Sequence, residues 1–186
     1  AILASRLIDR PIRPLFPKGF RNDVQIVASV LSSDQEEHPD VYAILGASFA
    51  LTLSPAPFEG PIGAVRIGRI DGQMIVNPTY AQSEKGDMNI VVAGSKESVI
   101  MVEAGLNFVT EEDIIAAVDL AQIEIRKQVE AQEKFAQECG IVKPEFVNPF
   151  DTTKLQEFIS NLTKDMVFDA YHNFDREYGE NKIKEA

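Results

Sequence analysis

Hydrophobic and polar positions follow two different periods along the chain, and these periods separate strand-like from helical stretches. Residues 62–70 and 73–77 alternate as strands do, and Asp71-Gly72 between them is a strong hairpin signal. Runs rich in β-branched residues predict further strands over residues 24–31, 88–94 and 98–105. Residues 41–53 are apolar at nearly every position, with small side chains interleaved, which predicts a buried helix packed closely against a sheet.

Two longer helical stretches follow the strands. Thr110 is a good N-cap residue before an acidic first turn, and apolar positions then keep helical spacing up to a stop at Cys139-Gly140. Two prolines interrupt residues 143–150, which predicts a linker. A second amphipathic helix is predicted to be capped at Asp151, with one apolar side formed by Leu155, Phe158, Ile159, Leu162, Met166, Val167, Ala170 and Phe174.

The stretch from residue 5 to residue 17 gathers arginines and prolines in a way that the rest of the chain does not. On a helix Arg6, Arg10 and Arg13 stand at i, i+4 and i+7, so their guanidinium groups line one face. Pro11 limits the regularity of this helix, and the prolines that follow end it, so the arginines lie near a kink or a helix end. A planar guanidinium fork donates two parallel hydrogen bonds to phosphate oxygens, which makes this face a candidate anion site.

The same spacing has two simpler interpretations. Arg10 or Arg13 could pair with Asp9 or with other carboxylates, and three arginines on one face can also form an ordinary solvated surface. The net charge of the 186-residue chain is -11, so its average field repels nucleic acid. Any binding of nucleic acid must come from a local basic patch, and the first turns of chain supply one with Arg6, Arg10, Arg13, Lys18 and Arg21.

Composition and cysteine content limit the class of protein. The hydrophobic share of 45% and the charged share of 25% fit a globular domain with an appendage. The sequence has no apolar run of membrane-spanning length and no signal segment, which predicts a protein that is neither membrane-bound nor exported. The single cysteine, Cys139, fits a reducing cytoplasm. The chain begins at Ala1 in what reads as the middle of a helix, so we expect a fragment.

Two further groups of residues are candidates for ion binding. Arg66 and Arg69 lie in one predicted strand at positions that alternation places on opposite faces, so one of them could point inward to an anion and the other to solvent or a salt bridge. His38 could join the acidic residues of the preceding loop around a metal. That loop, however, has the composition of an ordinary solvated segment that caps a helix.

Several stretches resemble one known family. The run Arg-Leu-Ile-Asp-Arg-Pro-Ile-Arg-Pro-Leu-Phe-Pro from Arg6 resembles the segment that opens the helix of the first RNase PH-like core in polynucleotide phosphorylases. The resemblance continues through Gly46-Ala-Ser, residues 58–66, Val91-Val-Ala-Gly and Met101-Val-Glu-Ala-Gly. It implies an α/β (α+β) fold, RNase PH-like and similar to domain 2 of ribosomal protein S5. Residues 1–142 would form the first core, truncated at its N-terminus, and residues 143–186 the start of an all-helical domain.

The resemblance also implies a function. Family members degrade single-stranded RNA from its 3' end with inorganic phosphate, release nucleoside diphosphates, use Mg2+ and assemble as homotrimers, in some cases within an RNA-degradation assembly. The second core, absent from this chain, carries catalysis and binds the metal, so no catalytic or metal-binding residue is expected here. By resemblance Arg6 and Arg10 would contact the RNA backbone and Arg66 would belong to a degenerate anion site. Arg13 lies on the same face as Arg6 and Arg10, so we expect it to bind RNA as well.

This sequence departs from the catalytic pattern of the second core at two places. Gly46-Ala-Ser48 lacks the full serine-rich phosphate loop, and Asp87 resembles one catalytic aspartate but has no partner aspartate before it. A metal needs more than one carboxylate, so Asp87 is interpreted as a relic or a turn residue. Two alternatives remain: a free-standing, non-catalytic RNA-binding or assembly module, and an RNase PH-type enzyme active alone, against which the missing aspartate pair argues.

Overall fold

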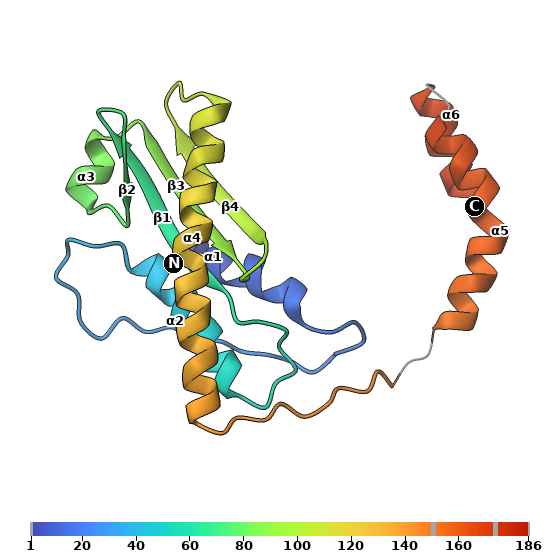
Figure 1. The fold of residues 1–186 in the computed structure, drawn as a ribbon. Coiled ribbons are helices and arrows are strands. Elements are labelled where there is room, and N and C mark those ends of the chain that lie inside the picture. Colours follow the sequence, from blue (N-terminus) through green and yellow to red (C-terminus); the bar gives the residue numbers. More distant parts are fainter. Residues whose placement is uncertain (1, 150–151, 173–174, 186) are drawn as a thin grey trace. The chain divides into compact units, whose positions relative to one another are not determined.

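The structure, a computed structural model, describes residues 2–149, 152–172 and 175–185 (Figure 1). Its backbone forms two compact units, residues 1–146 and residues 147–186, which are described separately below. The first unit holds a sheet with helices on both faces, and the second is helical. The mixed α/β class predicted from the sequence is confirmed by this arrangement.

Four antiparallel strands form the sheet of the first unit, in the order β2-β1-β3-β4. They are β1 (Gly63–Ile70), β2 (Gln73–Val76), β3 (Met88–Gly94) and β4 (Val99–Leu106). Asp71 and Gly72, in the turn between β1 and β2, both have positive φ, 50° and 77°. A type I′ turn requires positive φ at both central residues, which explains why Asp-Gly identified this hairpin correctly.

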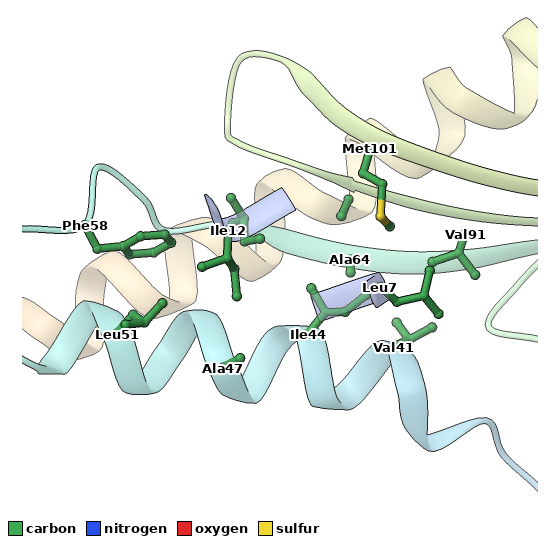
Figure 2. Close-up of a cluster of buried hydrophobic side chains, with 12 residues drawn as sticks. Leu7, Ile12, Val41, Ile44, Ala47, Leu51, Phe58, Ala64, Val91 and Met101 are labelled. Carbon is green, nitrogen blue, oxygen red and sulfur yellow. The ribbon is translucent and has the colours of Figure 1, made fainter. Parts of the chain in front are cut away.

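Helices α1 (Ile2–Ile12) and α2 (Pro39–Leu53) pack on one face of the sheet, and the short 3-10 helix η1 (Arg13–Leu15) follows α1. Figure 2 shows Leu7 and Ile12 of α1 directed toward the apolar face of α2. The outer side of α2 is not buried as predicted, since Tyr42, Gly46 and Ala50 are exposed. Helix α2 is buried only where α1, α4 or the sheet packs against it, and these three residues lie outside those contacts. Gly46 and Ala50 expose little apolar area. The buried hydrophobic cluster between α1, α2 and the sheet consists of Leu7, Ile12, Val41, Ile44, Ala47, Leu51, Phe58, Ile62, Ala64, Val91, Ala93 and Met101.

Helix α4 (Glu111–Glu138) covers the other face (Figure 1). The side chain of Thr110 accepts a hydrogen bond from the Asp113 N–H, and Gly140 after the helix has φ of 66°, so both predicted ends are confirmed. With 28 residues the helix is about 42 Å long. Its last turns pack against α2. The cluster under α4 consists of Val65, Ile67, Met88, Ile90, Val92, Ala117, Ala121, Ile125 and Val129.

The sequence prediction was wrong for residues 24–31 and missed α3 (Tyr80–Lys85). Residues 24–31 join no strand ladder, and Val27 and Leu31 are 77% and 95% exposed. β-branched residues favour extended backbone, but a strand also needs a hydrogen-bonded neighbour, and this segment has none among the described residues. Helix α3 is stabilised by a capping box between Thr79 and Gln82, a signal that is visible in the sequence as Thr-x-x-Gln.

The second unit consists of α5 (Thr153–His172) and α6 (Arg176–Glu185), which pack against each other. Gly179 lets the helices approach closely, since a Cβ at this position would lie 2.8 Å from the Ala170 carbonyl oxygen. Tyr178 Oη donates a hydrogen bond to Asp169 Oδ2 at 2.6 Å. Asp151 and Phe174, named in the prediction for this region, lie outside the described residues. The assignment of residues 143–186 to the start of an all-helical domain stays a prediction.

Candidate nucleic-acid interface

Helix α1 places its arginines on the side that faces away from the core. Leu7, Pro11 and Ile12 are buried, whereas Arg6 and Arg10 are exposed. The α-helix ends one residue after Pro11, and Arg13, also exposed, begins η1. The position of these arginines near a helix end, predicted from the prolines, is therefore confirmed.

The three arginines differ in their partners. Arg6 makes no hydrogen bond or ion pair with any other described residue. Arg10 Nη1 pairs with Glu103 Oε2 of β4 at 2.5 Å. Arg13 donates from both Nε and Nη2 to the Asp9 carboxylate, with its shortest contacts at 2.8 Å, and these hydrogen bonds raise the pKa of Arg13. The interpretation that Arg10 or Arg13 pairs with an acidic residue is confirmed for both arginines.

Aromatic rings hold the chain that follows η1. Phe16 stacks on Phe20 with ring centroids 5.5 Å apart and also contacts the buried Phe58. Phe20 in turn meets the edge of Phe146 at a centroid distance of 5.8 Å. The exposed Lys18 lies within this anchored stretch, which keeps a further positive charge close in sequence to the arginines.

Arg66 of β1 points toward α2 and is almost completely buried. Its Nη2 pairs with Asp40 Oδ2 at 2.6 Å, and its Nη1 donates to Asn89 Oδ1. The side chain of Asn77 accepts a hydrogen bond from the Arg66 main-chain N–H at 3.0 Å. The Nε of Arg66 is buried and has no hydrogen-bond partner among the described residues. A small pocket beside this group is lined by Glu37, His38, Val41, Tyr42, Arg66, Asn77 and Pro78.

Arg69 lies on the opposite face of β1 from Arg66, as alternation predicted, and forms salt bridges. It binds the Asp87 carboxylate through Nε and Nη2 at 2.9 and 2.7 Å, and its Nη1 lies 2.5 Å from Asp113 Oδ2. Hydrogen bonds from Arg69 are the main reason why the pKa values of Asp87 and Asp113 lie below the usual range. This pairing ties the end of β1 to the start of α4.

Carboxylates and imidazoles do not gather around a common point in the described ranges, 2–149, 152–172 and 175–185. No group of three or more His, Cys, Asp or Glu residues there could hold a metal ion. Both oxygens of Asp87 face Arg69, and His38 lies against Tyr80 and Ser83. The donor set described here therefore does not fit Mg2+, which prefers several oxygen ligands in an octahedral arrangement.

Sequence reasoning could not identify Glu103 as a partner of the arginine face. It lies 93 residues from Arg10 along the chain and reaches α1 from β4. The pairing depends on the register of β4, in which Glu103 lies opposite Val91 of β3 on the face that α1 covers. No local pattern signals such a contact.

Among the described helices, none has the length and apolar character that a membrane crossing requires.

Comparison with known proteins assigns the chain to a class. It matches domain 1 of the 3' exoribonuclease family over residues 1–57 and domain 2 of the same family over residues 60–124. The chain belongs to the 3' exoribonuclease family. Its curated relatives include the polyribonucleotide nucleotidyltransferases of Heliobacterium modesticaldum, Finegoldia magna and Gloeobacter violaceus.

The similarity to these three relatives extends along nearly the whole chain. Identities are 51%, 48% and 46%, over 95%, 87% and 99% of this chain and over 25%, 23% and 26% of the relatives, respectively. The chain thus spans about a quarter of their length. Among solved structures, rice (Oryza sativa) Rrp46 matches at 16% identity with a TM-score of 0.44, over 55% of this chain and 46% of that one.

Proposed function

We propose that this chain works as part of a phosphorolytic 3'-to-5' exoribonuclease, a polyribonucleotide nucleotidyltransferase, in which it contacts the RNA backbone. Family membership and the names of relatives about half identical in sequence support the activity. In this reaction an oxygen of inorganic phosphate attacks the terminal phosphodiester at the RNA 3' end. The bond to the 3' oxygen of the preceding nucleotide breaks, a nucleoside diphosphate leaves, and the reverse reaction lengthens the RNA.

The observation that carries the proposed role of this chain is the arginine face of α1. Arg6 and Arg10 are exposed one turn apart on a helix whose other side is fixed in the core, and Arg13 follows at the helix end. Because guanidinium groups stay charged and bind phosphate oxygens in pairs, they can hold a backbone without reading its sequence. In the proposal all three arginines contact RNA.

Catalysis and metal binding belong, in this proposal, to a second core outside this chain. Mg2+ and inorganic phosphate would bind there, and a homotrimer would bring cores together around single-stranded RNA. The donor set of the described residues, with Asp87 committed to Arg69, fits this division of roles. The single Cys139 is consistent with a cytoplasmic location, where association with an RNA-degradation assembly would take place.

Binding of a short poly(A) oligomer across a salt series tests the proposed role of α1 in RNA binding. For single-stranded RNA, removing one arginine that binds a phosphate lowers the slope of log K against log salt by about 0.7. The variant Arg6→Ala/Arg10→Ala should therefore have a slope that is lower by about 1.4. Lys127→Ala, which removes an exposed cation from α4, is the matched control and should keep the wild-type slope. Equal slopes in all three proteins would remove the proposed role of α1.

The division of catalysis can be tested on the 186-residue chain itself. Incubated with poly(A), phosphate and Mg2+, the chain should release no ADP. Release of ADP that depends on phosphate would place the reaction within this chain and would favour the enzyme that is active alone. RNA binding by a natural protein that lacks a second core would instead favour the non-catalytic RNA-binding module.

A second proposal concerns Arg66 as an anion site. Its support is the buried Nε without a partner among the described residues, beside a small pocket. An anion there must compete with the Asp40 carboxylate for the guanidinium. The variant Asp40→Asn should consequently bind inorganic phosphate more tightly than wild type in isothermal titration calorimetry. If Asp40→Asn still folds and binds no phosphate, Arg66 is a structural ion-pair partner and the anion site is wrong.

A further inference from the structure

The geometry of the two ion pairs on the arginine face differs in a way that bears on phosphate binding. Asp9 and Arg13 meet in a bidentate pair, so Nε and Nη2, one edge of the guanidinium fork, are both occupied by carboxylate oxygens. Glu103 contacts only Nη1 of Arg10, and the Nε and Nη2 edge of Arg10 has no partner among the described residues. Arg6 has no partner within the described chain.

A guanidinium offers a phosphate two such edges, Nε with Nη2 and Nη1 with Nη2, and Nη2 belongs to both. Asp9 contacts Nε and Nη2 of Arg13, so a phosphate bound through two parallel hydrogen bonds must share Nη2 with this carboxylate or displace it. The Asp9 carboxylate has the same charge sign and similar oxygen spacing, so it stands in for a phosphate at this position. Both side chains are well exposed, at 77% for Arg13 and 50% for Asp9. The closed state of an exposed ion pair is favoured over its open state by a factor of at most about five. A bound RNA strand can therefore displace Asp9 from Arg13.

We propose that Asp9 is an intramolecular competitor for RNA at Arg13, so that Arg6 and Arg10 bind the backbone first and Arg13 joins only when Asp9 is displaced. This inference rests on the proposed RNA-binding role of α1. It assigns Asp9 a specificity role, because weakly bound anions do not open the pair whereas a strand already held by two arginines presents its next phosphate at high local concentration.

The test measures poly(A) binding across a salt series for Asp9→Asn and Glu103→Gln. Each substitution removes one negative charge from this face, but only Asp9→Asn frees Nη2, the nitrogen that both edges of the guanidinium share. We expect Asp9→Asn to raise affinity and to steepen the slope by about 0.7, the value for one additional bound phosphate. Glu103→Gln should leave the slope unchanged, because Arg10 already has an open edge.

A double-mutant cycle separates release of Arg13 from a general charge effect. In an Arg13→Ala background, Asp9→Asn should leave the slope unchanged, because the arginine that it would free is missing. An equal gain in both backgrounds would mean that Asp9 acts only through its charge and would overturn the proposal. A urea unfolding curve for each variant checks that the fold is retained.

Failure of this inference differs from failure of the proposed function. If Arg6→Ala/Arg10→Ala lowers the slope but Asp9→Asn changes nothing, α1 binds RNA and Asp9 is not a competitor. If wild type and Arg6→Ala/Arg10→Ala have the same slope, the RNA-binding role of α1 is wrong and the inference falls with it.

Discussion

The Ser48 hydroxyl of α2 donates a hydrogen bond to Gln132 Oε1 of α4 at 2.9 Å, in the interior of the first unit. The same hydroxyl oxygen accepts from the Ile62 N–H at 2.9 Å, and Gln132 Nε2 donates to the Ile62 carbonyl oxygen at 2.8 Å. Two side chains thereby satisfy both main-chain groups of the residue just before β1. The network joins helices that cover opposite faces of the sheet.

Replacing Gln132 by leucine should destabilise the first unit by about 2–4 kcal/mol, because the buried Ser48 hydroxyl would lose the acceptor for its proton and the Ile62 carbonyl would lose its side-chain donor. Urea unfolding followed by circular dichroism measures this loss. Gln137→Leu, on the exposed side near the end of α4, is the matched control and should change stability by less than about 0.5 kcal/mol. A loss no larger than the control's would show that water replaces the missing amide.

The side chain of Lys143 binds main-chain carbonyl oxygens at and just after the C-terminal end of α2. Its Nζ lies 2.5 Å from the Leu51 carbonyl oxygen and 2.8 Å from those of Ser54 and Ala56, and burial lowers its pKa. Lys143→Met should cost about 1–2 kcal/mol in urea unfolding, since the ammonium group donates to carbonyl oxygens at a helix C-terminus and is favoured there by the helix dipole. Lys134→Met, whose partner Glu138 is 4.0 Å away on the surface, should be nearly neutral.

His38 predicts a pH dependence of stability. Burial, with the charge of Arg66 as a second cause, lowers its pKa below the usual 6.5, and the nearby Asp40 opposes this shift. The folded state therefore takes up the proton less readily than the unfolded state. Stability is full above about pH 6.5 and falls as the pH drops from there through the folded pKa.

The measurement is the urea midpoint at pH 7.5 and pH 5.5. Wild type should have a lower midpoint at the lower pH, and His38→Gln should show a smaller decrease. His172→Gln, at the other histidine of the sequence, should behave as wild type does. The same drop in wild type and His38→Gln would show that another group causes the pH dependence.

The Arg69 cluster predicts a second, more acidic transition. Because the folded pKa values of Asp87 and Asp113 lie below the unfolded value of 3.8, their contribution is present above pH 3.8 and is lost as the pH falls through the folded values. Arg69→Met should lower the urea midpoint at pH 7 and make stability less sensitive to acid below pH 4. Arg126→Met, on the surface of α4, should keep the wild-type acid profile.

Local signals in the sequence predicted the elements well, whereas contacts between distant residues could not be predicted. Thr110 caps α4 through its side chain, which accepts from the N–H three residues later, whereas Gly140 and Asp71-Gly72 act through their own backbone conformation. All of these effects lie within a few residues of the signal. The Arg10 pair with Glu103 depends on how helices and strands come together, and no spacing along the chain encodes it. The prediction for residues 24–31 failed for a related reason, because their strand propensity lacks a neighbouring strand among the described residues.

Helix α4 contacts elements on both sides of the sheet, and this affects how the first unit unfolds. It packs on β1 and β3 through one cluster, and near its end Phe135 meets Phe49 of α2, which belongs to the other side of the sheet. Detachment of α4 would therefore expose the cluster beneath it and also remove a contact of α2 on the other side of the sheet. The amides around Ile125 and Val129 should exchange with solvent only when the whole first unit unfolds, at one common rate with those in the centre of β3.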